Sequence, residues 1–539
     1  MTSKEQNDFM NSHGDPAAPL AVMLQFMPEA LSGEVYNAVV YRTGMQLRSQ
    51  RDTRDAVARS SDPRVKALVD SLAGLQTRAA AHALAYNPMA TPEETNAYVR
   101  TTSTLTAAIN RVEQQILDLT ASLRQGSVAD VAWEQVRDRL GRDEAALEYV
   151  YSGNRVMALL LRRHYKQPLA VNLGECAALA EKLSRNGRNS AAMARTLYRD
   201  GDTTLYNILW RGLEPHLKGV STVYHTMPGI LSAVALNAIA TPEGKTMFDK
   251  YNLVQLTTTA QLVFDAPAIK ADGISMMGDI LYSPTQKATT PVTPGARDVD
   301  MDYDLARDVS FDDMPGDDGT RSVKTDVFRH LPFTALELDS IDRLFPAGRV
   351  DSVRRLNASE ARLRHMIADS PAILHLATHG YYMTTDRDLS RHPFFRKHGT
   401  GSMQRSGVAL AGAELAWRGN STNDDDNDGI LTAAEIADLD MKKTGLVTLS
   451  ACETALGDFS FEGIFGLQRG FKQAGVKSLL VSLWSVNDYS TSLFMTSFYA
   501  SLRDGKPMQK AWRDAVDTVR LKYPNPYYWA PFILLDGSR

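Results

Sequence analysis

The features that mark secreted, membrane-bound and nucleic-acid-binding proteins are scarce in this chain of 539 residues. Its two cysteines, Cys176 and Cys452, cannot build a disulfide framework, which indicates a reducing compartment. No uninterrupted apolar run reaches the roughly 20 residues that a membrane-spanning helix requires. The polar opening MTSKEQNDFMNSHGDP lacks the apolar core of a signal peptide. Because 59 basic residues face 63 acidic ones, the net charge of −4 does not favour nucleic acid or a membrane surface as a partner. We therefore expect a cytoplasmic globular protein.

Three common catalytic and cofactor motifs are absent as well. The chain has no glycine-rich phosphate loop, no GxSxG nucleophile elbow and no HExxH zinc motif. His375 and His379 stand four residues apart, but on a predicted strand, so they do not form a helical pair of metal ligands. The sequence therefore predicts no cofactor.

The composition and the spacing of apolar residues change along the chain, and its length suggests about three domains. Residues 1–125 are predicted to form a helical N-terminal region, in which Val35, Val39 and Val40 recur at helical spacing. Residues 126–290 alternate short apolar runs, such as RVMALLLRR and SAVALNAIA, with helical stretches. This alternation predicts strand–helix units and a largely parallel sheet.

A stretch rich in Asp, Pro and Gly separates this part from the end of the chain. Residues 291–330 have too few aliphatic side chains to offset the entropy of ordering them, so a flexible linker is predicted there. Residues 331–539 contain four runs of the length expected for buried strands, namely PAILHLATHG, TGLVTLSACE, VKSLLVSLW and WAPFILLDG. The predicted fold class is α/β.

Two of these predicted strands end in reactive side chains. PAILHLAT is followed by His379 and Gly380, and TGLVTLSA by Cys452 and Glu453. Because ligand sites gather at the carboxyl ends of parallel strands, we expect His379 and Cys452 to face each other across one crevice. Histidine is the base that a cysteine nucleophile requires, and an imidazolium lowers the pKa of a neighbouring thiol. The backbone N–H groups of Gly380 and Cys452 would then stabilise an oxyanion. The residues alone leave a structural alternative open, because a free cysteine is commonly a small buried hydrophobe.

Several segments of the second half resemble one family. ILHLATHG, DGILTAAEI, LVTLSACETALGD, EGIFGLQRGFKQAG, SLLVSLWSVND and NPYYWAPFILLDG together resemble the CHAT-domain cysteine peptidases, which are grouped with caspases and separases. The resemblance covers roughly residues 126–539, and YNAVVYRTG resembles the segment that joins repeat arrays to CHAT domains. It implies a caspase-like parallel-sheet sandwich, with a degenerate half over residues 126–290 and an active half over residues 331–539. It also implies a catalytic dyad of His379 and Cys452.

The resemblance extends to a candidate substrate pocket. SLWSVND places Asp488 shortly after a third predicted strand, and separase-like relatives have an acidic pocket residue near this position. It implies that Asp488 binds an Arg or Lys side chain before the scissile bond through a charge-assisted hydrogen bond. An Asp at this place also fits a helix N-cap. Glu453 is a second candidate for the pocket, or it orients a neighbouring group.

An acidic loop matches the calcium-binding template of an EF-hand. The matching residues are Asp424, Asp426, Asp428, Gly429, Ile430 and Glu435. However, DGILTAAEI already belongs to the CHAT resemblance, and AELAWRGN is a poor incoming helix for an EF-hand. Calcium binding is therefore the weaker interpretation, and no metal site is otherwise predicted.

These observations predict a cysteine endopeptidase that acts on protein substrates. We expect it to be controlled either by a protein partner that binds the N-terminal helices or by an activation step at the linker. Two alternatives remain open at this point. One is a catalytically silent scaffold or adaptor in a signalling or defence assembly, and the other is a calcium-gated sensor.

Overall fold

The computed structural model describes most of the chain. The described residues are 22–42, 56–57, 60–84, 91–120, 131–152, 155–175, 197–198, 201–264, 269–289, 328–383, 392, 394–395, 403–420, 427–450, 457–460, 463–484 and 488–537. Cys176, Cys452, Glu453 and most of the predicted linker lie outside these ranges.

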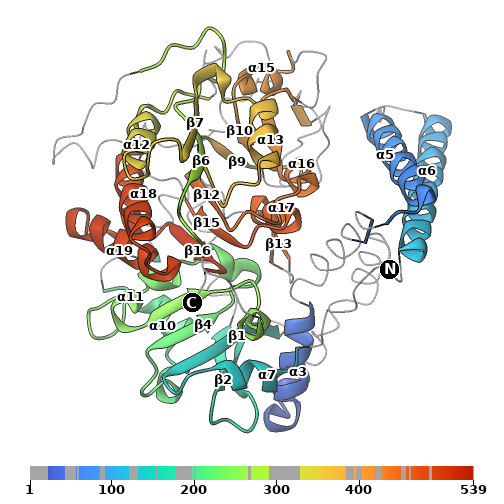
Figure 1. Ribbon diagram of the computed structural model, residues 1–539. Coiled ribbons are helices and arrows are strands. Elements are labelled where there is room, and N and C mark those ends of the chain that lie inside the picture. The colour runs from blue at the N-terminus through green and yellow to red at the C-terminus, as the bar shows by residue number, and fades with distance from the viewer. Residues whose placement is uncertain are drawn as a thin grey trace.

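One mixed sheet of eleven strands runs through the described residues (Figure 1). In spatial order its strands are β3 (Leu169–Glu175), β2 (Arg155–Arg162), β1 (Glu144–Ser152), β4 (Thr222–His225), β5 (Asn252–Gln255), β16 (Phe532–Leu535), β15 (Ser478–Ser482), β12 (Leu446–Ser450), β8 (Ile373–Ala377), β6 (Ile274–Gly278) and β7 (Val350–Arg354). Neighbours are parallel except in the β1–β2–β3 meander and in the β15–β16 pair. The predicted α/β class is confirmed, and so are the four strands expected after residue 331.

The two halves of the sheet meet where β5 lies beside β16. Gln255 of β5 is the Cα partner of Leu535 in β16, and the next residue, Asp536, donates its N–H to the Gln255 carbonyl at 3.0 Å. The Asp536 carboxylate accepts hydrogen bonds from the Thr257 N–H at 2.7 Å and hydroxyl at 2.6 Å, and it pairs with Lys472 at 2.6 Å. The C-terminal strand therefore joins both halves into one sheet.

Strand β6 shows how closely the two halves are interleaved. It precedes the predicted linker in the chain, yet it pairs with β7 and β8, which follow the linker. The stretch 291–330 thus lies in the connection between two strands that are neighbours in the sheet. The division of the chain into domains stays a prediction.

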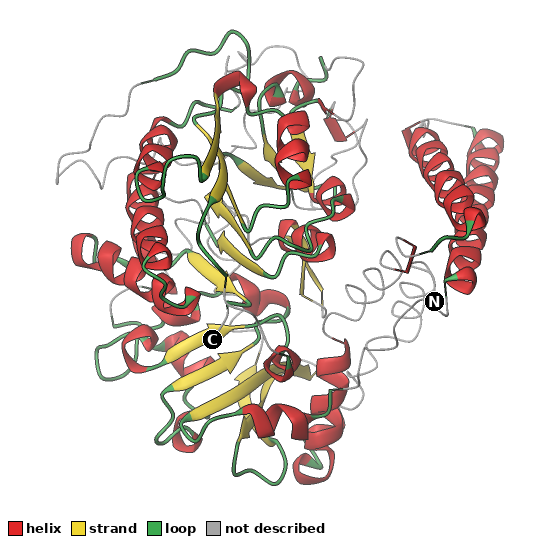
Figure 2. Cartoon of the chain, in the orientation of Figure 1, coloured by secondary structure: helices red, strands yellow, loops and turns green. Residues whose placement is uncertain are grey.

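Helices cover both faces of the C-terminal half of the sheet (Figure 2). One face carries α12 (Pro332–Asp342), α18 (Asp488–Arg503) and α19 (Met508–Lys522), and the other carries α13 (Glu360–Ala368), α16 (Ala433–Asp438) and α17 (Leu467–Ala474). The predicted helix ends at two glycines are confirmed. Gly475 after α17 has φ of +106° and Gly505 after α18 has φ of +78°, a left-handed conformation in which a residue without a Cβ is favoured.

The N-terminal half of the sheet is covered by shorter helices. Helices α3 (Pro28–Arg42) and α7 (Trp133–Arg139) pack on one face, and α10 (Thr204–Leu209) and α11 (Met247–Lys250) on the other. Val35, Val39 and Val40 are at most 1% exposed, which confirms the helical spacing predicted for α3. The Tyr36 hydroxyl lies 2.8 Å from the Thr259 hydroxyl, so α3 is tied to the α/β body.

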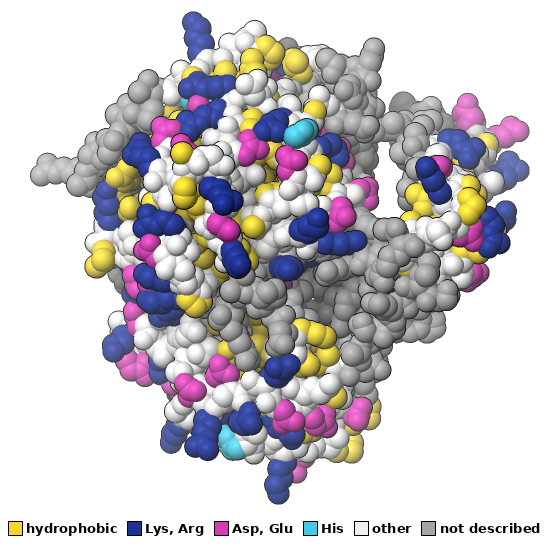
Figure 3. Space-filling model, in the orientation of Figure 1, with side chains coloured by type: hydrophobic (Ala, Val, Ile, Leu, Met, Phe, Trp, Pro, Cys, Tyr) yellow, Lys and Arg dark blue, Asp and Glu magenta, His cyan; other side chains and the backbone are white. Residues whose placement is uncertain are grey.

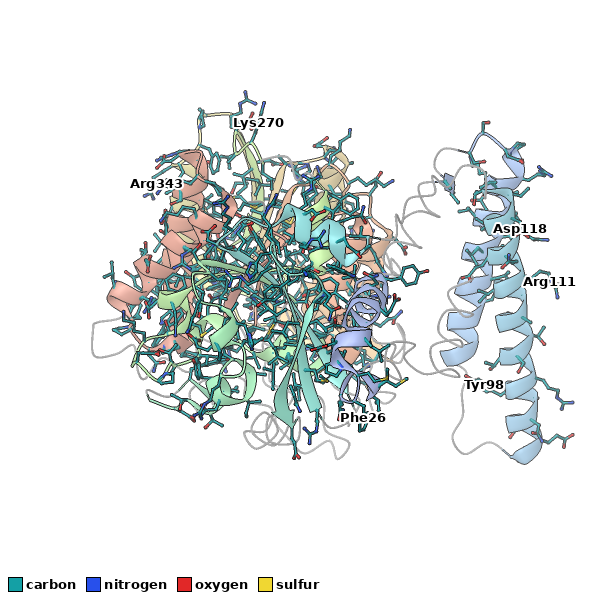
Figure 4. All side chains as sticks on the ribbon, turned by 90° about the horizontal axis from the view of Figure 1, so that it is seen from below. Phe26, Tyr98, Arg111, Asp118, Lys270 and Arg343 are labelled. Atoms are coloured by element: carbon teal, nitrogen blue, oxygen red, sulfur yellow. The ribbon has the colours of Figure 1, made fainter. Side chains whose placement is uncertain are left out.

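Two long helices stand apart from this body. Helices α5 (Pro63–Leu84) and α6 (Pro92–Leu119) pair with each other as a hairpin beside the sheet (Figure 1). Figure 4 labels Tyr98, Arg111 and Asp118 along α6 of this hairpin. The prediction of helix in this region is confirmed for the described residues.

Two predictions about local structure differ from what is observed. The run SAVALNAIA, taken as a short apolar unit of a strand–helix repeat, forms no strand, and most of its residues lie in the 3₁₀ turns Gly229–Ala233 and Leu236–Ala238. The expectation of a largely parallel sheet does not hold at β1–β2–β3, because short connections between these strands allow only antiparallel pairing.

Smaller elements complete the described parts of the fold. Strands β9 (Gly380–Tyr382), β10 (Ser406–Ala409) and β11 (Ile430–Thr432) form a small sheet, and β13 (Gly457–Ser460) pairs with β14 (Gly463–Gly466). Helices α15 (Ala413–Trp417) and α20 (Pro526–Trp529) are short.

On the face drawn in Figure 3, basic and acidic side chains are interspersed. A search of the described helices finds none long and apolar enough to cross a membrane.

Candidate active site

The candidate base lies at the carboxyl ends of two central strands. Strands β8 and β12 are parallel neighbours, and their last residues, Ala377 and Ser450, are Cα partners. The Thr378 N–H continues this ladder by donating to the Ser450 carbonyl at 3.3 Å. His379 lies two residues beyond Ala377, and Cys452 is two residues beyond Ser450 in the chain. Since Cys452 lies outside the described residues, its pairing with His379 stays a prediction.

The imidazole of His379 is held in one orientation. Its Nε2 lies 2.7 Å from the Arg329 carbonyl oxygen. A carbonyl oxygen only accepts, so Nε2 must donate and carries the proton. The ring is 2% exposed and packs against Tyr282 and Phe328, with ring centroids 5.0 Å and 5.8 Å away. In the neutral imidazole, Nδ1 is therefore the basic nitrogen.

The two aromatic rings around His379 are themselves anchored. The Tyr282 hydroxyl lies 3.0 Å from the Thr378 hydroxyl, one residue before the histidine. The Gln286 side chain accepts from the Tyr282 N–H at 2.8 Å and donates to the Phe328 carbonyl at 2.7 Å. The Phe328 ring also packs edge-on against Trp417. These contacts give the histidine a rigid wall on the side of residues 328–330.

Gly380 presents its backbone in a way that suits the predicted oxyanion role. It is the first residue of β9 and pairs with Val408 of β10. The Ala409 N–H donates to the His379 carbonyl at 2.9 Å, which makes Gly380–Val408 a pair without direct hydrogen bonds in the ladder. The N–H of Gly380 is therefore directed away from β10. Whether it binds an oxyanion stays a prediction.

A second histidine beside the site escaped the sequence analysis. His330 lies one residue after Arg329, and its Nε2 is 2.8 Å from the Asp279 carboxylate. Asp279 follows β6 directly, so an acidic residue at the end of the run ISMMG was the available signal. The Arg329 carbonyl that contacts His379 is a backbone group, and no side-chain pattern marks it.

A fully buried polar network lies within the sheet below the site. Nε2 of His375 in β8 is 2.9 Å from the Glu337 carboxylate of α12, and both residues are 0% exposed. Its Nδ1 lies 3.2 Å from the Tyr499 hydroxyl of α18, which donates to the Thr448 hydroxyl of β12 at 2.8 Å. Burial raises the pKa of Tyr499, so it stays a neutral hydrogen-bonding group. The network links β8 and β12 to the helices on one face.

The described residues do not test the prediction of a substrate pocket at Asp488 and Glu453. Asp488 is the first residue of α18, which begins six residues after the end of β15 at Ser482. Its side chain and the whole of Glu453 lie outside the described parts of the chain. The pocket role and the helix-cap role of Asp488 therefore both stay predictions.

The acidic loop shows local hydrogen bonds at its two described carboxylates. Asp428 accepts from the Ile430 N–H at 2.9 Å, and Glu435 accepts from the N–H and hydroxyl of Thr432 in a capping box that starts α16. Among the described residues, no group of three or more His, Cys, Asp or Glu side chains is arranged to hold a metal ion. Asp424 and Asp426 lie outside those residues, so calcium binding stays a prediction.

A buried carboxyl beside this loop yields a pH-dependent prediction. Glu360 is 0% exposed and accepts from the Gly429 N–H at 2.7 Å. Burial, followed by the charge of Glu435, raises its pKa to about 8. Between its ordinary pKa and about 8, the folded protein keeps a proton that the unfolded chain has released, so the free energy of unfolding falls as the pH rises. Glu360→Gln retains the acceptor for Gly429 and should flatten this decline between pH 5 and 8.5, measured as the pH dependence of the thermal unfolding midpoint. Parallel profiles for the two proteins would contradict the prediction.

The chain matches one protein family over most of its α/β part. Residues 202–538, more than half of the chain, match the CHAT domain, and the chain belongs to the CHAT-domain family. The resemblance seen in the sequence is therefore confirmed.

The comparisons with individual proteins give partial or distant similarities. Tetratricopeptide repeat protein 28 is 33% identical in Mus musculus and 32% identical in Homo sapiens, over 111 residues that make up 20% of this chain. The match spans only 4% of the length of those relatives. Among solved structures, a separase–securin complex of Saccharomyces cerevisiae is 10% identical with a TM-score of 0.39, covering 94% of this chain and 40% of that one. The Arg-specific cysteine proteinase gingipain R is 8% identical with a TM-score of 0.33, covering 60% and 65%. Structural likenesses of this strength support no inference about this chain.

Proposed function

We propose that this chain is a cysteine endopeptidase with a dyad of His379 and Cys452. The observation that carries the proposal is the register of β8 and β12, whose paired last residues stand two positions before the histidine and the cysteine. The Arg329 carbonyl supports it further, because it holds His379 in the tautomer whose Nδ1 can accept a proton. Membership of the CHAT-domain family agrees with this chemistry.

The proposed reaction has two stages. Nδ1 of His379 takes the proton of the Cys452 thiol, and the thiolate sulfur attacks the substrate carbonyl carbon. The N–H groups of Gly380 and Cys452 bind the oxyanion. The tetrahedral intermediate then collapses, the C–N bond breaks, and the imidazolium of His379 gives its proton to the leaving amine. Water, deprotonated by the same histidine, attacks the thioester and releases the acid and the free thiol.

The proposal includes a preference for basic side chains. Asp488, with Glu453 as a second candidate, would bind an Arg or Lys side chain of the residue before the scissile bond. It also includes control by a protein partner at the N-terminal helices or by an activation step. A preference for large apolar residues at this position would contradict the pocket without contradicting the dyad.

The organisation proposed for this peptidase follows the predicted boundaries. Residues 1–125 would form the helical region, residues 126–290 the degenerate half, residues 291–330 the linker and residues 331–539 the active half. Strand β6 would then be contributed to the active half by residues that precede the linker, since it pairs with β7 and β8.

Cleavage of a diverse peptide library tests the proposal directly. The full-length protein should cut a subset of peptides, Cys452→Ala should cut none, and Cys176→Ala should cut as the unmodified protein does. The second variant is the matched control, because it removes the only other thiol of the chain. Cuts that persist in Cys452→Ala would overturn the dyad. Absence of cutting by all three proteins, with and without candidate activating proteins and calcium, would favour the scaffold alternative.

A further inference from the structure

The residues that orient His379 are carried by a short backbone segment. Residues 328–330 lead into α12, and the carbonyl of the middle one, Arg329, contacts Nε2 of His379 at 2.7 Å. Because this contact is made by a backbone carbonyl, substitution of the Arg329 side chain does not remove it. Its position is set by what holds the residues on either side, of which Phe328 is bound through its carbonyl to Gln286 at 2.7 Å.

The other side of the segment is held by His330. The Thr289 N–H donates to Nδ1 of this histidine at 3.0 Å, so Nδ1 is unprotonated. Its Nε2 must then carry the proton, which it donates to the Asp279 carboxylate at 2.8 Å. The His330 and Asp279 side chains are 2% and 3% exposed, so water competes little for this hydrogen bond.

Asp279 connects this histidine to three elements around the site. It follows the last residue of β6, its N–H donates to the Thr334 hydroxyl of α12 at 2.8 Å, and its carboxylate pairs with Arg355 after β7 at 2.5 Å. Its φ of +52° lies in the left-handed region, which costs a non-glycine residue about 1 kcal/mol or more. Asp is among the side chains that tolerate this conformation. The surrounding hydrogen bonds therefore stabilise a strained backbone at the strand end.

His330 is unsuited to act as a second general base. Both of its ring nitrogens are used, Nδ1 by Thr289 and Nε2 by Asp279, so no lone pair is left for a substrate. The Thr289 hydroxyl also lies 2.9 Å from Nδ1. The hydrogen bonds of His330 therefore hold the segment 328–330 in place.

We propose that Asp279 and His330 are positioning residues that hold the Arg329 carbonyl against Nε2 of His379 and so reserve Nδ1 for the thiol. This inference rests on the proposed dyad. Loss of the anchor lets the segment 328–330 shift, so His379 exchanges tautomers and orientations and stabilises the Cys452 thiolate less well. The anchor thus acts on thiol reactivity through two residues that never touch the substrate.

The test measures thiol reactivity in full-length protein that carries Cys176→Ser, so that Cys452 is the only thiol. Iodoacetamide alkylation is followed from pH 5 to pH 9, with and without His330→Leu, which fills space but makes neither hydrogen bond. His330→Gln is the conservative variant, because its amide can donate to Asp279 and accept from Thr289. His225→Leu is the matched control, since His225 is also a buried histidine and lies at the end of β4 in the other half of the sheet.

We expect His330→Leu to raise the pKa of the Cys452 thiol by about one unit, so the midpoint of the alkylation profile moves up by about one pH unit. Because a more basic thiolate is the better nucleophile, the alkylation rate at pH 9 rises by about threefold. His330→Gln should reverse most of this shift, and His225→Leu should leave the profile unchanged. If His330→Leu does not fold, Asp279→Asn serves instead, because Asn tolerates the positive φ and weakens the same contacts. It should give a smaller shift in the same direction.

The outcomes separate this inference from the proposed function. An unchanged profile in His330→Leu and Asp279→Asn, beside a profile that His379→Ala alters, would overturn the positioning role and leave the dyad standing. Equal shifts in His330→Leu and His225→Leu would also overturn it, because they would reflect general destabilisation. A profile that His379→Ala leaves unaltered would instead overturn the dyad, and the positioning role with it.

Discussion

Substitution of His379 by alanine is expected to turn Cys452 into an ordinary thiol. At pH 6 a thiol with a pKa of about 8.5 is ionised to about 0.3%, whereas a thiol beside an imidazolium is mostly ionised. The lower basicity of such a thiolate makes it roughly 10- to 20-fold less reactive. The net expectation is that the unmodified dyad is alkylated about tenfold faster than the variant at pH 6, and more slowly than the variant at pH 9. Alkylation rates in the Cys176→Ser background measure this crossing.

The same substitution is expected to lower peptide cleavage by about 10²- to 10⁴-fold, since the base and the acid of the reaction are both lost. His379→Gln is the matched control for folding, because its amide N–H can still donate to the Arg329 carbonyl that now accepts from Nε2. Gln cannot take a proton, so it should lose thiol activation as fully as alanine does. If both variants show the same alkylation profile as the protein that retains His379, then His379 does not activate Cys452.

Removal of the Glu337 side chain is expected to destabilise the fold strongly. The carboxylate and His375 are both 0% exposed and 2.9 Å apart, so Glu337→Ala leaves Nε2 of a buried imidazole without its partner. Breaking a buried pair from one side costs about 3–5 kcal/mol, because the remaining group stays desolvated. The free energy of unfolding, measured by urea titration with tryptophan fluorescence, should fall by that amount.

An exposed ion pair on the same helix provides the control. Asp339 of α12 pairs with Arg354 at 2.6 Å but is about half exposed, so Asp339→Ala should cost about 0–1 kcal/mol. Glu337→Gln, which retains size and hydrogen-bonding atoms, should fall between the two. If Glu337→Ala and Asp339→Ala lower the unfolding free energy equally, the buried pair contributes no more than a surface pair.

Much of the fold was predictable because its signals are local. The apolar run ILHLA predicts a buried strand wherever it occurs, and β8 spans those five residues. Gly475 predicts a helix end because its left-handed conformation depends on its own backbone. His379 lies two residues beyond the end of this strand, so its place at a strand end was also accessible from order along the chain.

Other features depended on which strands become neighbours. Periodicity predicts that ISMMG is apolar enough for a strand, but not that β6 pairs with β7 and β8 rather than with the strands nearer to it in sequence. The run SAVALNAIA shows the opposite failure, since an apolar composition fits 3₁₀ turns in a buried connection as well as a strand.

By itself, the sequence determined the α/β class, the CHAT-domain family and a histidine at a strand end, because strand length, helix ends and motifs are properties of short segments. Only the tertiary structure decided what surrounds that histidine. The Arg329 carbonyl lies 50 residues from His379 in the chain, and His330 lies 51 residues from Asp279. Such contacts follow from strand order in the sheet, and a backbone carbonyl leaves no trace in the pattern of side chains.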